Sequence, residues 1–98
     1  MSIGYRRQAR LELSEAVAWY EEQRPGLGAE FDQAVAVLLQ RAAENPGRFP
    51  HVTPLVRKAR LKRFPYFIYF SEIEGAIQVI AVIYARRNPE WIQRRLAD

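Results

Sequence analysis

The chain of 98 residues has no cysteine and a single histidine, His51. Without cysteine there is no disulfide bond and no thiolate chemistry. One histidine argues against a metal site built on histidine ligands, and we expect neither a metal nor another cofactor. His51 falls in a proline-containing stretch, residues 48–54, that we interpret as a loop. We therefore favour an exposed or locally hydrogen-bonded histidine over a catalytic one.

Long apolar runs and the common catalytic motifs are also missing. No apolar run reaches the roughly 20 residues that cross a bilayer, so we expect no membrane contact. Arg6, Arg7 and Arg10 are not followed by the apolar stretch of a secretory signal, and we expect a cytoplasmic protein. There is no glycine-rich phosphate loop and no Ser/His/Asp set that can be placed together. The sequence therefore lacks the catalytic motifs of most enzyme classes.

The positive charge is concentrated in the second half of the chain. The formal net charge is +4, with six Lys/Arg and seven Asp/Glu in residues 1–49, but nine and four in residues 50–98. The halves therefore carry −1 and +5. So basic a half favours an acidic partner, either nucleic acid or an acidic protein segment. The alternative is a solvated basic face that maintains solubility.

The first half predicts two amphipathic helices. The first carries apolar residues at spacings of three and four from Ala9 to Tyr20 and ends by Gln23 or Arg24, because Pro25 disfavours helical geometry in the preceding residue. A second helix ends at Asn45-Pro46-Gly47. Its apolar stripe consists of Phe31, Ala34, Val35, Leu38, Leu39 and Ala42. The short turn between them predicts an antiparallel hairpin that needs a further surface to cover.

The second half predicts three strands. In the first, alternation over residues 55–64 places Leu55, Ala59 and Leu61 toward the helices and Lys58, Arg60 and Lys62 toward solvent. Residues 66–72 and 77–84 predict two more strands, joined by a turn at Glu74-Gly75. We expect the last strand to be central because it is apolar on both faces. Its predicted faces are Ile77, Val79, Ala81 and Ile83 on one side, with Ile80 and Val82 on the other.

The two ends of the chain complete the predicted order. Ile3-Gly4-Tyr5 is compatible with an edge strand, and Asn88-Pro89-Glu90 is a strong helix start. The predicted fold is a two-layer α+β domain over residues 1–98, in the order β-α-α-β-β-β-α. In it the N-terminal helical hairpin packs on a small, largely antiparallel sheet.

The remaining candidates for function are cationic and aromatic. Arginine and lysine can hold phosphates or receive acidic residues of a partner, and tyrosine can stack on bases or transfer protons. For Tyr66 and Tyr69 we favour packing. Arg63 is predicted to point to the apolar side of its strand, which is costly without a role or a partner. The candidate binding residues are Lys58, Arg60, Lys62, Arg63, Arg86 and Arg87.

Several segments, taken together, resemble the RelE/ParE superfamily of toxins from bacterial toxin–antitoxin pairs. The resemblance spans nearly the whole chain. It is carried most by the turn Arg63-Phe64-Pro65-Tyr66 and the later Arg86-Arg87-Asn88-Pro89. The other matching segments are Trp19-Tyr20, Phe31, Asn45-Pro46, Val79-Ile80-Ala81-Val82 and Trp91.

The resemblance implies the same α+β fold, a cognate antitoxin as partner, and one of two targets. RelE-like members cleave mRNA in the ribosome with arginine, lysine and a late tyrosine or histidine, whereas ParE-like members inhibit DNA gyrase and lack that set. No tyrosine follows Tyr84 here, and the Arg-Phe-Pro-Tyr turn is more typical of ParE-like sequences. A non-enzymatic gyrase inhibitor, as in plasmid stabilization, is therefore favoured. The alternatives are a metal-independent, RelE-like endoribonuclease using Arg63, Tyr84 and Arg86, and a non-toxic basic binding module.

Overall fold

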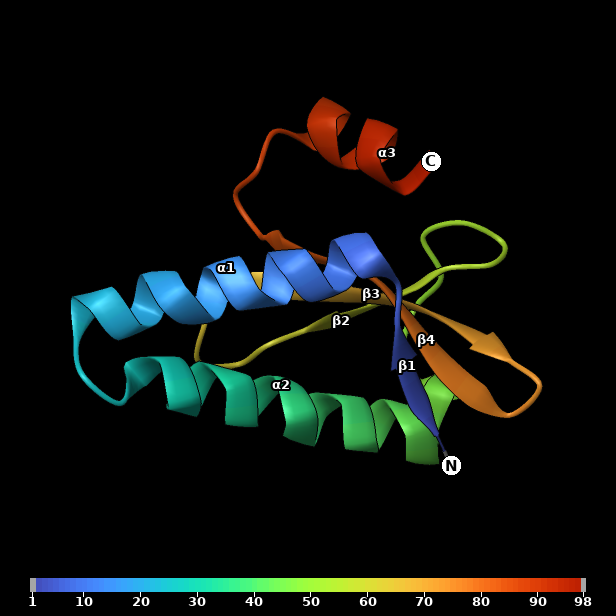
Figure 1. Cartoon of the computed structure of the whole chain (residues 1–98). Helices are drawn as coiled ribbons and strands as arrows, with labels where there is room; N and C mark the ends of the chain where they lie inside the picture. Colours follow the sequence, from blue (N-terminus) through green and yellow to red (C-terminus); the bar gives the residue numbers. More distant parts are fainter. Residues whose placement is uncertain (1, 98) are drawn as a thin grey trace.

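The computed structural model describes residues 2–97, and its elements follow the predicted order. They are β1 (Ile3–Tyr5), α1 (Arg7–Gln23), α2 (Leu27–Glu44), a short 3-10 turn (Pro46–Arg48), β2 (Arg57–Arg60), β3 (Tyr66–Ile73), β4 (Ala76–Tyr84) and α3 (Pro89–Ala97). Helices α1 and α2 run antiparallel, side by side, and α3 lies beyond α1 (Figure 1). In this part of the chain, no helix combines the length and the apolar character needed to span a bilayer.

The sheet has the strand order β1-β4-β3-β2. Strand β1 pairs in parallel with β4, and the other two pairings are antiparallel. The predicted α+β class, the largely antiparallel sheet and the edge strand at Ile3–Tyr5 are therefore confirmed. So is the interior position of the strand that is apolar on both faces, because β4 lies between β1 and β3.

A glycine and a glutamate determine how the two long helices meet. Gly28 at the start of α2 is buried, and a Cβ there would lie 2.6 Å from the carbonyl oxygen of Val17 on α1. The Glu21 carboxylate of α1 accepts hydrogen bonds from the backbone N–H groups of Gly26 and Gly28, at 3.0 Å each. It thereby satisfies N–H groups that a helix start leaves without a partner. The Glu21 side chain therefore holds the start of α2 against α1, and the absence of a side chain at Gly28 lets the two helices approach closely.

The predicted apolar faces of both helices are buried against the sheet. Ala9, Ala16 and Tyr20 of α1 are buried, as are Phe31, Val35, Leu38, Leu39 and Ala42 of α2. The centre of this core is aromatic: the ring centroids of Tyr20, Phe31 and Phe64 lie 4.9–5.1 Å apart. Edge-to-face and offset arrangements at such distances are the favourable ones for aromatic pairs.

Strand β2 is shorter than predicted. The backbone N–H of Val52 donates to the carbonyl of Val56, and the Thr53 hydroxyl accepts from the Val56 N–H, so residues 52–56 form a turn rather than a strand. Leu55 at this turn is 78% exposed, and its predicted place against the helices is wrong. Ala59 and Leu61 are buried on the helix side, as predicted. The strand also ends at Arg60, before the residues that were predicted to complete it.

A bulge in β4 corrects the predicted faces of that strand. Phe70 pairs with Val79 and Tyr69 with Ala81, so Ile80 has no partner across the ladder. A bulge turns two consecutive side chains to the same side of a sheet. Ile77, Val79 and Val82 consequently face the helical hairpin, whereas Ile80, Ala81 and Ile83 face α3. All are buried, but the prediction that Ala81 and Ile83 share a face with Val79 is wrong.

Candidate functional site

The structure places two of the six predicted cations on the outer face of β2. Lys58 and Arg60 lie over the ring of Phe67, 4.5 and 5.2 Å from its centroid. Phe67 packs with the apolar residues on the α3 side of the sheet, so the predicted alternation of β2 holds for these two side chains. Cations held over an aromatic face keep their charge exposed while their stems cover apolar surface.

Arg63 lies on a different surface, next to α2. Because β2 ends at Arg60, Arg63 belongs to the loop before β3 and does not point into the core, contrary to the prediction. Its Nη2 lies 2.7 Å from Glu30 Oε1, and its guanidinium lies over the ring of Phe64. The hydrogen bond from Arg63 is the main cause that lowers the pKa of the Glu30 carboxyl. Arg24 contacts the same carboxylate at 3.3 Å, and both ion pairs are exposed to solvent.

An apolar groove with a basic rim lies between α2 and the end of β2. Its volume is about 830 Å³. The apolar lining residues are Ala29, Ala34, Val37, Leu38, Phe49 and Leu61, and the cations are Arg41, Arg60, Lys62 and Arg63. Arg60, the last residue of β2, therefore borders both Phe67 and this groove. Lys62 lies beside α2, although it was predicted to face away from the helices. Glu30 also lines the groove, but it is held by Arg24 and Arg63. Val37 is 50% exposed there, off the buried stripe of α2.

Val37 and Arg41 also line this groove, and neither was predicted from the sequence. The sequence signal for Val37 was that this apolar residue lies outside the apolar stripe formed by Val35, Leu38 and Leu39. A valine on the solvent side of an amphipathic helix indicates either a tolerated exposed residue or a partner surface. Only the approach of residues 60–63 to α2 makes it part of a groove.

The last predicted cations follow β4, at the start of α3. The Arg87 guanidinium lies 3.8 Å from the ring centroid of Trp91. Arg86 is exposed. The Asn88 side chain accepts a hydrogen bond from the backbone N–H of Glu90 at 2.8 Å and so caps α3, as predicted. This third group of cations belongs to neither β2 nor the groove.

The residues named for an endoribonuclease do not gather around one hollow. Arg63 lines the groove beside α2, whereas Tyr84 lines a hollow of about 360 Å³ between α1 and α3. Tyr84 is 41% exposed, and its ring lies 5.7 Å from that of Tyr66. Burial raises the pKa of both Tyr66 and Tyr69, in keeping with the packing roles predicted for them.

The loop histidine and the carboxylates form no metal centre in the part of the chain that the structure describes. No group of three or more His, Asp or Glu side chains from residues 2–97 is placed to hold a metal ion. His51 is exposed and pairs with Arg57 through an isolated backbone bridge.

The element order, the sheet order and the helical hairpin together define a small α+β fold known from bacterial toxin–antitoxin systems. No family model matches the chain, and no curated protein sequence does. Among solved structures, the chromosomal ParDE TA system from P. aeruginosa matches with a TM-score of 0.75 and 20% sequence identity. The match covers 88% of this chain and 97% of that chain. The fold implied by the RelE/ParE resemblance is therefore confirmed.

Proposed function

We propose that this protein is a ParE-like toxin of a type II toxin–antitoxin system, which inhibits DNA gyrase in the cytoplasm and is neutralised by a cognate antitoxin. The observation that carries the proposal is the shared fold with a ParDE structure over 88% of the chain. The ParE-like features of the sequence, with no tyrosine after Tyr84, favour gyrase over mRNA as the target.

The groove beside α2 is the proposed antitoxin site. Its apolar floor suits the apolar face of an amphipathic segment, and the rim of Arg41, Arg60, Lys62 and Arg63 suits carboxylates on the other face. The contact between Arg63 and Glu30 occupies this rim in the free protein. An acidic segment would compete with Glu30 for Arg63, so binding exchanges one carboxylate for another rather than leaving a charge without a partner.

The target surface is proposed on the cations outside the groove. Lys58, which is half-buried on β2, and the exposed pair Arg86 and Arg87 lie away from the groove. Charged groups at the rim of an interface mainly steer association and set its specificity.

The target is tested by running two assays on the same purified protein. We expect inhibition of supercoiling by DNA gyrase and no cleavage of ribosome-bound mRNA in primer extension. Cleaved mRNA with unaffected supercoiling would replace the proposal with the endoribonuclease. If both assays are negative and unprotected cells grow normally, the chain is a non-toxic basic module.

The antitoxin site is tested with Val37→Glu, which adds a carboxylate to the apolar floor of the groove. Because Val37 is half-exposed, we expect the variant to fold and to inhibit gyrase while its affinity for the antitoxin falls at least roughly tenfold. Leu11→Glu is the matched control, since Leu11 is 52% exposed on α1 and does not line the groove. Equal antitoxin binding by both variants would remove the groove from the proposal.

A further inference from the structure

Both tryptophans of the chain lie against a cleft beneath α3. One hollow, of about 700 Å³, lies between the start of α1 and α3; its lining residues are Arg6, Arg7, Gln8, Ile80, Trp91, Arg94 and Arg95. The hollow of about 360 Å³ that contains Tyr84 also contains Trp19, Gln8 and Trp91. Because Gln8 and Trp91 line both, the two hollows meet there. We call the joined hollows the α3 cleft.

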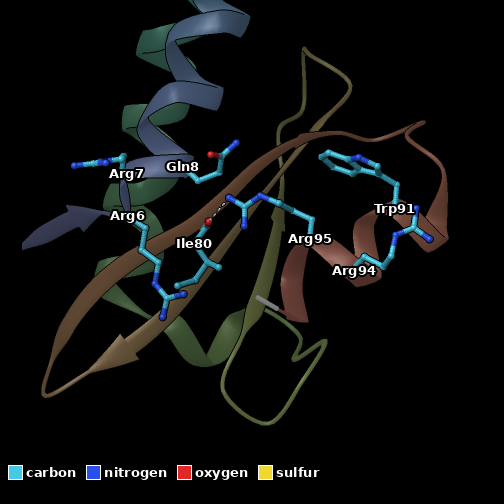
Figure 2. Close-up of a pocket in the computed structure, with 7 residues that line it drawn as sticks. All are labelled: Arg6, Arg7, Gln8, Ile80, Trp91, Arg94 and Arg95. Atoms are coloured by element: carbon cyan, nitrogen blue, oxygen red, sulfur yellow. Dashed lines mark hydrogen bonds between the residues drawn. The ribbon is translucent and has the colours of Figure 1, made fainter.

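One end of the α3 cleft is strongly basic. Four arginines and no carboxylate line the larger hollow. Arg95 is used inside the fold, since its Nη2 donates to the Ile80 carbonyl at 2.8 Å and its guanidinium binds Glu12. Arg6 extends beside Ile80, Arg7 points away from α3, and Arg94 lies on α3 at the other side of Arg95 (Figure 2). Within residues 2–97, the side chains of Arg6, Arg7 and Arg94 make no hydrogen bond or ion pair, so their positive charge is available to a ligand.

The other end of the cleft is aromatic. Trp19 is 53% exposed and Tyr84 41% exposed, so both offer ring surface to solvent. Trp91 already carries the Arg87 guanidinium at 3.8 Å from its ring centroid. The carboxylates in this hollow are Glu12, which Arg95 neutralises, and Glu15. Exposed rings beside a positively charged hollow provide two kinds of contact at once.

We propose that the α3 cleft binds single-stranded nucleic acid. Arginine side chains bind phosphates, and aromatic faces stack on any base, which is the combination that single-strand sites use. An acidic peptide would use Arg7 and Arg94 but would leave Trp19 and Tyr84 without a contact. A duplex keeps its bases stacked inside, so it cannot place one against these rings. The antitoxin groove does not account for this cleft, and the proposed gyrase surface shares Arg87 with it.

The tryptophans make the proposal testable without a label. Since the chain has two tryptophans and both line the cleft, stacking there should quench the intrinsic fluorescence. We expect quenching by 12-residue oligo(dT) or oligo(U), with an affinity that falls as salt rises. Trp19→Phe should retain the part of the signal that arises from Trp91. Duplex DNA bound as tightly as the single strand, or poly-glutamate that displaces it, would overturn the proposal.

Arginine variants separate the cleft from general attraction to a basic protein. Arg7→Ala combined with Arg94→Ala should weaken binding roughly tenfold, because two phosphate contacts are lost. The control is Arg10→Ala combined with Arg48→Ala, which removes the same charge from exposed residues that line neither the cleft nor the antitoxin groove. We expect less than roughly a threefold effect from the control pair. Equal losses in both pairs would show that the net charge, not the cleft, holds the oligonucleotide.

Discussion

Replacing Arg95 with alanine removes the polar contact that ties α3 to the rest of the fold. Its Nε lies 2.8 Å from Glu12 Oε2, and its Nη2 lies 3.0 Å from Glu12 Oε1. Glu12 Oε1 in turn accepts a hydrogen bond from the backbone N–H of Val82 at 3.0 Å, and the Ile80 carbonyl accepts one from Arg95 Nη2. Strand β1 pairs with β4 no further than Val79. The side chains of Glu12 and Arg95 thus form hydrogen bonds with backbone groups of β4 beyond the point where β1 ends.

The burial of this pair sets the size of the expected effect. The Arg95 and Glu12 side chains are 13% and 10% exposed, so Arg95→Ala leaves a carboxylate largely shielded from water and the Ile80 carbonyl without its donor. Removing one partner of a buried ion pair costs about 3–5 kcal/mol. Some water reaches this site, and α3 can shift to admit more. We therefore expect a loss of about 2–4 kcal/mol in the free energy of unfolding.

The assay is urea unfolding followed by circular dichroism and by the fluorescence of Trp91 in a Trp19→Phe background. The two probes distinguish global destabilisation from release of α3, since release exposes Trp91 before the helical signal is lost. Arg94→Ala is the control, because Arg94 is exposed on the same helix and its substitution removes the same charge. We expect it to change stability by less than about 0.5 kcal/mol. If Arg95→Ala and Arg94→Ala behave alike, the ion pair does not hold α3.

Three further predictions concern the core. Gly28→Ala should lower the free energy of unfolding by about 1–3 kcal/mol, because the added Cβ would lie 2.6 Å from the carbonyl oxygen of Val17. Gly47→Ala is the control in thermal unfolding, and it should show no such loss because the nearest atom to its Cβ would be 3.6 Å away. Leu38→Ala should cost about 2–5 kcal/mol as a core truncation, and an unchanged Tm would contradict its buried position. Burial raises the folded-state pKa of Tyr69 above 10.0, so the unfolded chain ionises first and stability falls as the pH passes that value. Tyr69→Phe should therefore lose less stability between about pH 8 and 11 than the parent chain in urea titrations.

The helices were predictable because their signals are local. The period of the apolar residues places Ala16, Tyr20 and Phe31 on core faces. Helix α1 ends just before Pro25, because a proline disfavours helical geometry in the residue that precedes it. The start of α3 was equally clear, since Asn88 supplies the cap through its own side chain. Each of these features depends on neighbours a few residues away in the chain.

The errors in the sheet arise from contacts that alternation does not encode. Hydrogen bonds of Thr53 and Val56 close the turn at residues 52–56. The turn carries Leu55 away from the helices, although Leu55 fits the period-two pattern of the residues that follow it. The bulge at Ile80 depends on pairing with β3, and in sequence the strand 77–84 is apolar at nearly every position. A pattern without polar residues cannot show where the face changes.

The candidate cations were predictable as residues but not as surfaces. Their number in the second half pointed to an acidic partner, yet alternation could not show that the chain leaves the sheet after Arg60. That exit places Arg63 beside α2 and opposes it to Glu30, 33 positions away in sequence. Lys58 stays on the opposite face of the sheet, over Phe67. One basic segment of sequence therefore supplies two separate surfaces.

The bulge at Ile80 also explains why a cleft exists beneath α3. With regular alternation, Ile80 and Ala81 would face opposite sides; the bulge turns both toward α3, where they pack with Trp91, Ile92 and Leu96. This apolar contact and the Arg95 ion pair hold a short helix over the start of α1, and its arginines come to lie near those that precede Gln8. A variant that restores regular pairing at Ile80 should therefore loosen α3 and weaken oligonucleotide binding together. Retained binding with a loosened α3 would show that the arginines act without the cleft.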